Sequence, residues 1–363
     1  MPAYLNLIST AVPEYEYRQE KLRDKMKEIV AENETQERIL HQIYSRSGIS
    51  KRYSVLKDFN AGPEESPMLF FNGHGAAPPT GFRNDIYIRE SRKLYVETAK
   101  KLLQESGLKP TSITHLVTVS CTGFYAPGPD YDIIKHAGLN PQTERYHLGF
   151  MGCYAAIPAL KLAAKLAEND PEATVMVVSA ELCSLHFQAN PKTDDLISAS
   201  VFGDGAAGAI VSSREFGKNR LKISGFSSTV TKKGSEDMAW SIGDQGFNMV
   251  LSTYIPDLLI SGLDDYIKPL LKKYALPADE VDRWAVHPGG RAILDKVENF
   301  MGMKNGSLTE SRKVLNNYGN MSSATILFVL REMMNDNYDD GENIIALAFG
   351  PGLTIESAHL SRD

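Results

Sequence analysis

The sequence predicts an α/β protein in which helices cover the faces of buried sheets. Two observations support this fold class. Short apolar runs recur along the 363 residues, and segments with the period of a helix lie between them. The chain is also 42% hydrophobic and 23% charged, a composition that suits a globular protein with a large core.

Five runs are predicted as buried strands because each is short, apolar and mostly rich in β-branched residues. They are residues 115–120 (HLVTVS), 174–180 (TVMVVSA), 207–213 (AGAIVSS), 284–287 (WAVH) and 343–349 (NIIALAF). Their alternation with helical segments is the main argument for the fold class.

Three segments between these runs predict helices. Residues 89–107 are amphipathic and end at a glycine, which commonly terminates a helix. Residues 155–169 are apolar on most of their surface, so this helix should be buried. Residues 322–336 begin with two serines that could cap a third helix.

Two further stretches bear on domain organisation. Residues 60–84 are rich in glycine and proline and are predicted to form a long surface excursion. The polar stretch 214–222 is the best candidate boundary, and it divides the chain into an N-terminal half, 1–215, and a C-terminal half, 216–363.

Charge and cysteine content exclude several classes of protein. The net charge of −6 provides no attraction for nucleic acid or for an anionic membrane. The first residues lack the pattern of a signal peptide, and no apolar run approaches the roughly 18–20 residues that span a bilayer. Three cysteines are too few for a disulfide framework, so we expect a cytoplasmic protein.

Cys153 is the first candidate for chemistry. It lies in GFMGCYAA, after a glycine and just before a predicted helix. Free amides and the helix dipole at such a position favour a thiolate, which is the nucleophilic form of cysteine. The alternative interpretation is a structural cysteine that fills the core.

His287 and Asn320 are two more candidates. His287 ends a predicted strand in WAVHPGGRAILD, and Asn320 follows a glycine in NNYGNMSSATI. Each could instead serve the backbone, the histidine as a hydrogen-bond partner and the asparagine as a helix cap. With Cys153 they form a set at expected strand-to-helix turns, where open α/β folds collect functional sites. A papain-like hydrolase also uses Cys, His and Asn, but the flanking residues here differ from that pattern.

The motifs around these residues resemble those of the type III polyketide synthases, the chalcone/stilbene synthase-like family. In chain order they are GFMGCYAA (149–156), FGDGAA (202–207), HPGGRAILD (287–295), YGNMSSAT (318–325) and FGPGLTIE (349–356). The resemblance implies a thiolase-like fold with five αβαβα layers, made of two related halves. It also implies a homodimer in which each protomer holds a complete triad.

The resemblance implies a mechanism as well. Cys153, as a thiolate paired with a His287 imidazolium, would take the starter acyl group from an acyl-CoA. Malonyl-CoA would then lose carbon dioxide, and His287 and the Asn320 amide would stabilise the resulting enolate. Repeated condensation would lengthen the chain before cyclisation. The family needs no metal and no cofactor beyond its CoA substrates.

Further site residues follow by matching motifs to the family. Phe202 and Phe247 take the places of two gating phenylalanines, although plain core packing is the alternative for both. Gly289 and Gly290 would let the pantetheine arm of CoA approach the backbone. Residues in the positions of the CoA-binding cations are Arg46, Lys51 and Arg52, for which a solvated face is the alternative. Residues expected to line the cavity are Cys121, Thr122, Cys183, His186, Ser322, Phe349 and Pro351.

Departures from the plant pattern bear on the substrate. Cys121 and Cys183 replace threonines of the plant enzymes, which is typical of bacterial members that make tetrahydroxynaphthalene, alkylpyrones or alkylresorcinols. Arg291 replaces a proline, and Ala348 replaces a glycine. We therefore expect an aliphatic acyl-CoA starter and an alkylpyrone or alkylresorcinol product. The alternatives are a malonyl-primed synthase with an aromatic product, another thiolase-fold condensing enzyme, or a hydrolase.

Overall fold

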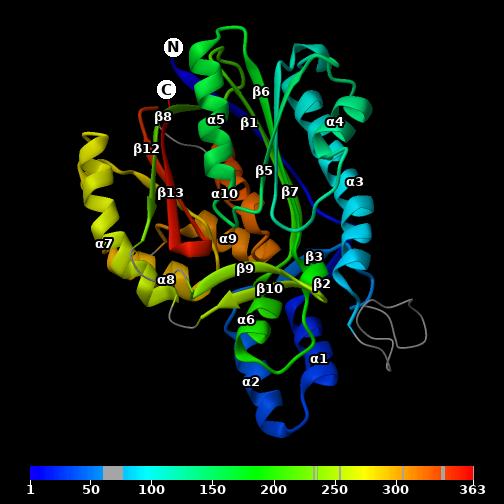
Figure 1. The fold of residues 1–363 in the computed structure, drawn as a ribbon. Coiled ribbons are helices and arrows are strands. Elements are labelled where there is room, and N and C mark those ends of the chain that lie inside the picture. The colour runs from blue at the N-terminus through cyan, green and yellow to red at the C-terminus, as the bar shows by residue number, and fades with distance from the viewer. Residues whose placement is uncertain are drawn as a thin grey trace.

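The computed structural model describes most of the chain. The described residues are 1–59, 77–231, 234, 236–252, 255–304, 306–336 and 340–362. Two sheets alternate with three layers of helices, so the molecule has the five-layered arrangement expected of a thiolase-like fold (Figure 1).

The two sheet layers are joined by hydrogen bonds between β1 and β8. Their strands therefore form one continuous sheet of nine strands, in the order β11-β12-β13-β8-β1-β7-β6-β4-β5. The C-terminal strands are β8 (Leu221–Val230), β11 (Arg283–Val286), β12 (Asn343–Gly350) and β13 (Thr354–Ser361). The N-terminal strands are β1 (Ala3–Ala11), β4 (His115–Ser120), β5 (Glu144–Gly149), β6 (Thr174–Leu182) and β7 (Asp204–Ser212). The halves meet where Ala3, Tyr4 and Leu5 of β1 pair with β8.

Two helices form the central layer, α5 (Ala156–Asn169) and α10 (Thr325–Asn335). Alanines of α5 recur at helical spacing and are 0–1% exposed, and they are Ala156, Ala159, Ala163, Ala164 and Ala167. Their small side chains let the helix pack between the two sheets. In α10, every residue from Ile326 to Leu330 is buried, which suits a helix enclosed on all sides.

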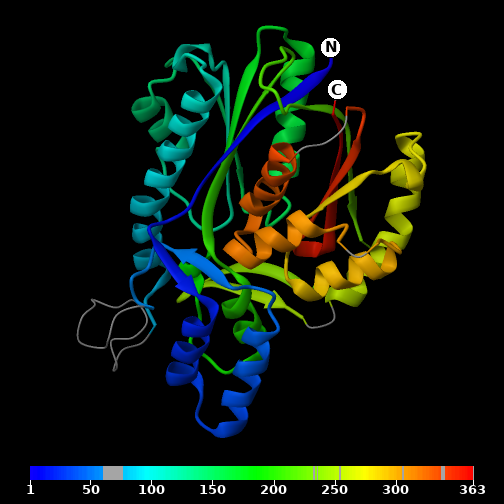
Figure 2. The ribbon, with the colours of Figure 1, turned by 180° about the vertical axis from the view of Figure 1, so that it is seen from behind.

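Helices on the outer faces complete the layers. The helices α3 (Thr80–Ser106) and α4 (Pro129–Ala137) cover the N-terminal strands, whereas α7 (Ile255–Lys273) and α8 (Arg291–Phe300) cover the C-terminal ones (Figures 1 and 2). Helix α9 (Thr309–Tyr318) precedes α10. Among the described helices, none is long and apolar enough to cross a membrane.

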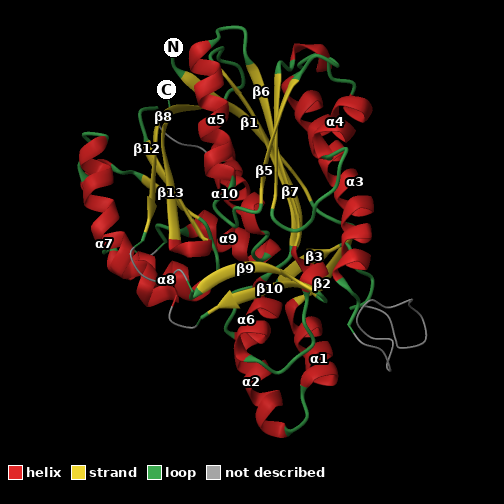
Figure 3. Ribbon diagram, viewed as in Figure 1, coloured by secondary structure: helices red, strands yellow, loops and turns green. Residues whose placement is uncertain are grey.

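A small lobe extends from the layered body. It consists of α1 (Gln19–Val30), α2 (Glu34–Ser45) and α6 (Thr193–Val201), beside the strand pair β2 (Tyr15–Arg18) and β3 (Lys51–Ser54) (Figure 1). Between lobe and body runs a second ribbon of two strands, β9 (Met238–Gly243) and β10 (Gly246–Leu251) (Figure 3). The sequence analysis predicted none of these elements.

All five predicted strands and all three predicted helices are present, and all but the strand 115–120 have shifted ends. The largest shift is at α3, which begins at Thr80 and not at residue 89. The predicted excursion 60–84 is therefore wrong for residues 80–84, because Thr80 bonds to the backbone of the β9–β10 turn and starts the helix there. Residues 60–76 lie outside the described part of the chain.

The serines before α10 do not cap it. Ser322 and Ser323 form a 3₁₀ turn, and the helix begins at Thr325 without a side-chain cap. Ser323 instead donates a hydrogen bond to the buried carboxylate of Glu181. The predicted cap is wrong because a buried acceptor competes for the hydroxyl group.

Candidate active site

Cys153 lies in the tight turn between β5 and α5. The turn depends on Gly152, whose φ is +98°, and a Cβ added there would lie 2.2 Å from Cδ of Pro351. The Gly152 amide donates to the Cys121 sulfur at 2.9 Å. These contacts hold Cys153 at the edge of an internal cavity, which its side chain lines.

His287 follows the last residue of β11. Its backbone amide donates to the Leu347 carbonyl at 2.8 Å, which continues the strand pairing by one residue. The residue is 1% exposed, and neither ring nitrogen has a hydrogen-bond partner among the described residues. Buried ring nitrogens without protein partners are costly, so the imidazole is suited to a polar ligand in the cavity that it lines.

Asn320 is held by its backbone and by one side of its amide group. Its backbone N–H donates to the Val201 carbonyl at 2.8 Å, and its backbone carbonyl accepts from the Gly203 N–H at 2.9 Å. Its Oδ1 accepts from the Ser322 amide at 2.9 Å, which fixes the orientation of the side chain. Nδ2 has one long bond of 3.3 Å, to the Gly289 carbonyl, so a second N–H remains for the cavity.

The expected setting of Asn320 was wrong. It lies between α9 and the 3₁₀ turn that precedes α10, and not after a strand. Its link to the sheet region comes from a parallel bridge with Phe202, at the end of α6. The other two residues do lie at strand-to-helix turns.

One cavity brings the candidate triad together with most of the other predicted residues. Besides Cys153, His287 and Asn320, the predicted residues that line it are Cys121, Thr122, Cys183, His186, Phe202, Phe247, Gly289, Ser322, Phe349, Pro351 and Arg52. Three predicted residues, Arg46, Lys51 and Gly290, do not line it. The three cysteines are free and border the same space.

Burial controls the protonation of the candidate nucleophile and its base. It raises the pKa of Cys153 to about 11, although the nearby side chains of Ser322 and Asn320 act to lower it. It lowers the pKa of His287 to about 3. Burial therefore opposes both charged forms of the expected thiolate–imidazolium pair. The N-terminal end of α5 does not outweigh desolvation here.

His186 forms part of an aromatic surface on one side of the cavity. Its ring stacks on Phe247 at 3.9 Å between centroids, and Trp240 meets it edge-on at 5.4 Å. The Phe247 amide donates to His186 Nδ1 at 3.0 Å, so Nε2 carries the hydrogen that it donates to the Thr122 carbonyl at 2.8 Å. Burial lowers the pKa of His186 to about 3, and the neutral ring is fully used in these bonds.

The two predicted gating residues differ in their surroundings. Phe202 is partly exposed, because it lies at the end of α6 beside Asn320 and borders the cavity. Phe247 is 3% exposed and is held in the stack with His186. Met249, two residues further along β10, also lines the cavity and was not predicted.

A buried carboxylate lies behind the cavity. Glu181 is 0% exposed and accepts hydrogen bonds from the Cys121 amide at 2.9 Å, from Thr122 Oγ1 at 2.8 Å and from Ser323. Burial raises its pKa against these bonds. Because Ser323 belongs to the C-terminal half and Glu181 to the other, the network ties together the two halves at the site.

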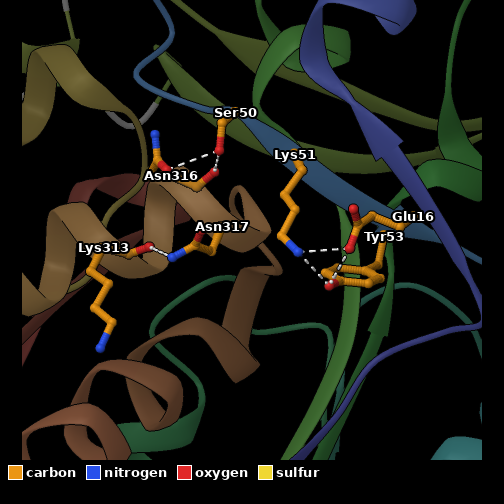
Figure 4. Close-up of polar contacts among 7 residues, drawn as sticks. All are labelled: Glu16, Ser50, Lys51, Tyr53, Lys313, Asn316 and Asn317. Carbon is orange, nitrogen blue, oxygen red and sulfur yellow. Dashed lines mark hydrogen bonds and ion pairs between the residues drawn. The ribbon is translucent and has the colours of Figure 1, made fainter.

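The structure separates the three predicted CoA-binding cations. Arg46 directly follows α2 and is exposed. Lys51 donates to Glu16 at 2.7 Å and to the Tyr53 hydroxyl at 3.1 Å (Figure 4). Arg52 is 6% exposed and donates to Gln19 and to the carbonyls of Ala199 and Phe202, so its guanidinium stabilises the fold behind Phe202 and does not fit the predicted phosphate contact.

The cavity also has an apolar arm that sequence reasoning missed. Its lining continues from the triad to side chains of the lobe, and these are Tyr17, Leu22, Met26, Tyr44, Phe59 and Phe187. The ribbon of β9 and β10 adds Met238, Trp240, Met249 and Leu251. No motif marks these residues, because they come together only when the lobe folds against the body.

A partly buried cysteine that lines one cavity with a histidine lacking a described ring partner and with an oriented amide is suited to acyl transfer and condensation. Two family models match the chain: the N-terminal domain of chalcone and stilbene synthases over residues 2–215 and the C-terminal domain over residues 224–362. The chain therefore belongs to the chalcone and stilbene synthase family, and it is a type III polyketide synthase.

Solved structures agree with this assignment. The chain is similar to PKS-I from the brown alga Ectocarpus siliculosus, with 27% identity and a TM-score of 0.90, covering 100% of this chain and 98% of that one. It is also similar to the C-terminal type III polyketide synthase domain of Steely1, a type I/III hybrid from Dictyostelium. That match has 27% identity and a TM-score of 0.92, and covers 100% of this chain and 99% of the other.

Within the described ranges, no group of three or more His, Cys, Asp or Glu side chains is arranged to hold a metal ion.

Proposed function

We propose that the enzyme loads an aliphatic acyl group from CoA onto Cys153, extends it with malonyl-CoA and cyclises the product to an alkylpyrone or alkylresorcinol. The observation that carries this proposal is the single cavity, because its lining includes Cys153, His287 and Asn320 and continues into an apolar arm. The triad supports condensation, and the arm supports an aliphatic starter.

Loading begins with a neutral pair. As the Cys153 sulfur attacks the thioester carbonyl, His287 accepts the thiol proton, for which its unprotonated ring is suited. The new C–S bond gives a tetrahedral intermediate. Its collapse breaks the bond to CoA, and the imidazolium returns the proton to the departing CoA sulfur. The acyl group is then held on Cys153.

Extension needs stabilisation of an enolate. When malonyl-CoA loses carbon dioxide, the electrons of the broken C–C bond develop charge on the thioester oxygen. The free N–H of Asn320 and the His287 ring supply donors at that point. The enolate carbon attacks the acyl carbon on Cys153, and the C–S bond to the enzyme breaks with its electrons on sulfur, so Cys153 leaves as a thiolate and takes a proton from water to restore the thiol.

The apolar arm supports the choice of starter. Leu22 and Met26 of α1 are buried in the lobe core and also line the cavity, so a hydrocarbon tail placed there leaves water. Each methylene transferred contributes about 0.8 kcal/mol to binding. Preference for a starter should therefore rise with chain length until the arm is filled.

The decisive experiment is incubation of the purified enzyme with malonyl-CoA, alone and with acyl-CoAs of two to sixteen carbons. We expect pyrones or resorcinols whose mass follows the starter. An aromatic product from malonyl-CoA alone would replace the aliphatic starter by malonyl priming. Release of free fatty acid without any condensation product would contradict a synthase and indicate a hydrolase.

We also propose a homodimer in the cytoplasm. Strand β5 lies at the edge of the nine-stranded ladder, and four of its six residues are exposed, which supports pairing with a second copy. The three free cysteines suit a reducing compartment. Light scattering after size exclusion would give twice the chain mass of 40.1 kDa for a dimer, and the single chain mass would contradict it.

A further inference from the structure

We infer that Arg291 is a binding residue for the phosphate groups of CoA, at the mouth of the catalytic cavity. The inference rests on the proposed function, because it names the contact by which that site holds its CoA thioesters. The mechanism above gives Arg291 no role.

Position is the first argument. Arg291 is the first residue of α8 and is exposed, with 53% of its side chain accessible. Gly289, two residues before Arg291, and Ile293, two residues after it, both line the catalytic cavity. Arg291 therefore lies on the rim, where the cavity that holds the thioester opens outward.

A second arginine lies close to it. The stem of Arg291 packs against Gly48, where an added Cβ would be 3.3 Å from Cβ of Arg291. Arg46 is two residues before Gly48, is exposed, and has no described partner for its guanidinium. The chain segment that carries Arg46 thus packs against the side chain of Arg291, although the two are far apart in sequence.

The charge balance leaves Arg291 free to bind an anion. Its only described bond is from Nε to Asp295 at 3.3 Å, so the two terminal nitrogens face no acceptor in the described part of the chain. Asp295 is shared with Arg312 at 2.7 Å, and Arg312 also binds Glu298 at 2.7 Å. Arg312 is thus paired with both carboxylates at short distance, whereas Arg291 holds Asp295 only through the longer Nε contact.

The hydrogen-bonding geometry of the Arg291 guanidinium group fits a phosphate ligand. The planar fork of arginine donates two parallel N–H bonds to a phosphate, which a lysine cannot reproduce. CoA carries a diphosphate and a 3′-phosphate at the end of a long pantetheine arm whose thioester must reach Cys153. A phosphate held at the rim would leave that arm to pass Gly289 into the cavity.

Arg291→Pro is a sharp test, because proline is well tolerated at the first position of a helix and should leave α8 intact. The measurement is the rate of Cys153 acylation, followed by intact mass, as a function of octanoyl-CoA concentration. We expect the half-saturating concentration to rise about three- to tenfold, with little change for the octanoyl thioester of N-acetylcysteamine, which lacks phosphate. The difference should shrink at 1 M salt.

Matched variants separate charge from geometry. Arg291→Lys should recover part of the loss, and Lys296→Ala, which removes an exposed cation from the same helix, should leave CoA saturation unchanged. An equal change for both octanoyl thioesters in Arg291→Pro would show a structural effect and overturn the inference. An unchanged half-saturating concentration would overturn it as well.

Calorimetric titration with CoA, 3′-dephospho-CoA and pantetheine makes the test independent of turnover. A loss in Arg291→Pro for CoA but not for 3′-dephospho-CoA assigns the 3′-phosphate, and an equal loss for both assigns the diphosphate. Tight CoA binding by the wild type without condensation would contradict the proposed function alone. Equal binding of CoA by wild type and Arg291→Pro would contradict the inference alone.

Discussion

At the scale of single residues, the site contains two polar side chains, His287 and Asn320, that do not make all the hydrogen bonds they could make. The His287 ring has no described partner, and Asn320 keeps one N–H free while its Oδ1 is bound to the Ser322 amide. Such arrangements cost stability unless a ligand completes them. This unfilled capacity supports the two side chains as the donors in the proposed mechanism.

Asn320→Ala should damage decarboxylation more than loading. Removal of one oxyanion donor costs about 2.7–4 kcal/mol, so malonyl-CoA decarboxylation should fall roughly a hundred- to a thousandfold. Release of carbon dioxide from labelled malonyl-CoA measures this step, and the mass shift of Cys153 measures loading. Equal loss of both steps would show that Asn320 is needed for the fold of the turn and not for the enolate.

The reactivity of Cys153 should follow its raised pKa. Because burial places that pKa at about 11, the thiolate fraction, and with it the rate of alkylation by iodoacetamide, should rise tenfold per pH unit from pH 6 to pH 9. A rate that reaches a plateau below pH 7 would contradict the neutral pair and restore the thiolate–imidazolium form. The variant Cys153→Ala provides the background from Cys121 and Cys183.

At the scale of elements, the arm of the cavity is formed where α6 packs against α1 and α2. Ala199 of α6 lines it with a small side chain. Replacement of Cys121 is a poorer probe of this space, since its sulfur accepts the Gly152 amide hydrogen bond that supports the turn of Cys153. Blocking the arm from the lobe side leaves that turn untouched.

Ala199→Phe should therefore suppress long starters selectively. Each methylene that loses its apolar site forfeits about 0.8 kcal/mol, or about fourfold in binding, so the ratio of decanoyl to acetyl turnover should fall steeply. Product formation from the two starters in competition gives this ratio. Thr193→Phe, at the exposed start of the same helix, is the control. An unchanged ratio in Ala199→Phe would exclude the arm as the site of the tail.

Helix α5 should tolerate no larger side chain on its buried faces. Ala163 is 0% exposed in the central layer, so Ala163→Leu should destabilise the protein by about 1–3 kcal/mol through overpacking. Denaturant unfolding measures the change, with Lys165→Leu at an exposed position of the helix as the control. Equal stability of both variants would mean that the two sheets can separate around α5.

The elements also show what the sequence could predict. Strand 115–120 has the predicted bounds, and α5 begins one residue after its predicted start, because local period and composition define such buried elements. The lobe and the β9–β10 ribbon were missed. Their strands are short or partly exposed. These elements also depend on contacts between residues far apart in the sequence, such as the hydrogen bond from the Phe247 amide to His186, which no local sequence pattern encodes.

At the scale of the whole molecule, the two halves contribute to one site. Cys153 comes from the first half, and His287 and Asn320 come from the second, so none of the chemistry exists before the halves meet. The motifs predicted the triad and most of the residues around it. They did not predict the direction in which burial shifts the pKa values of Cys153 and His287, or the surroundings of Arg52, because both depend on the assembled fold.

The central claim is that Cys153 carries the acyl chain, and intact-mass measurement with peptide mapping after mixing with octanoyl-CoA tests it most directly. We predict one octanoyl group per chain, located on the peptide that contains Cys153. We predict no adduct and no polyketide from Cys153→Ala, while Cys121→Ala and Cys183→Ala still become acylated. An adduct on Cys153→Ala of the same size and rate as on the wild type would contradict the account.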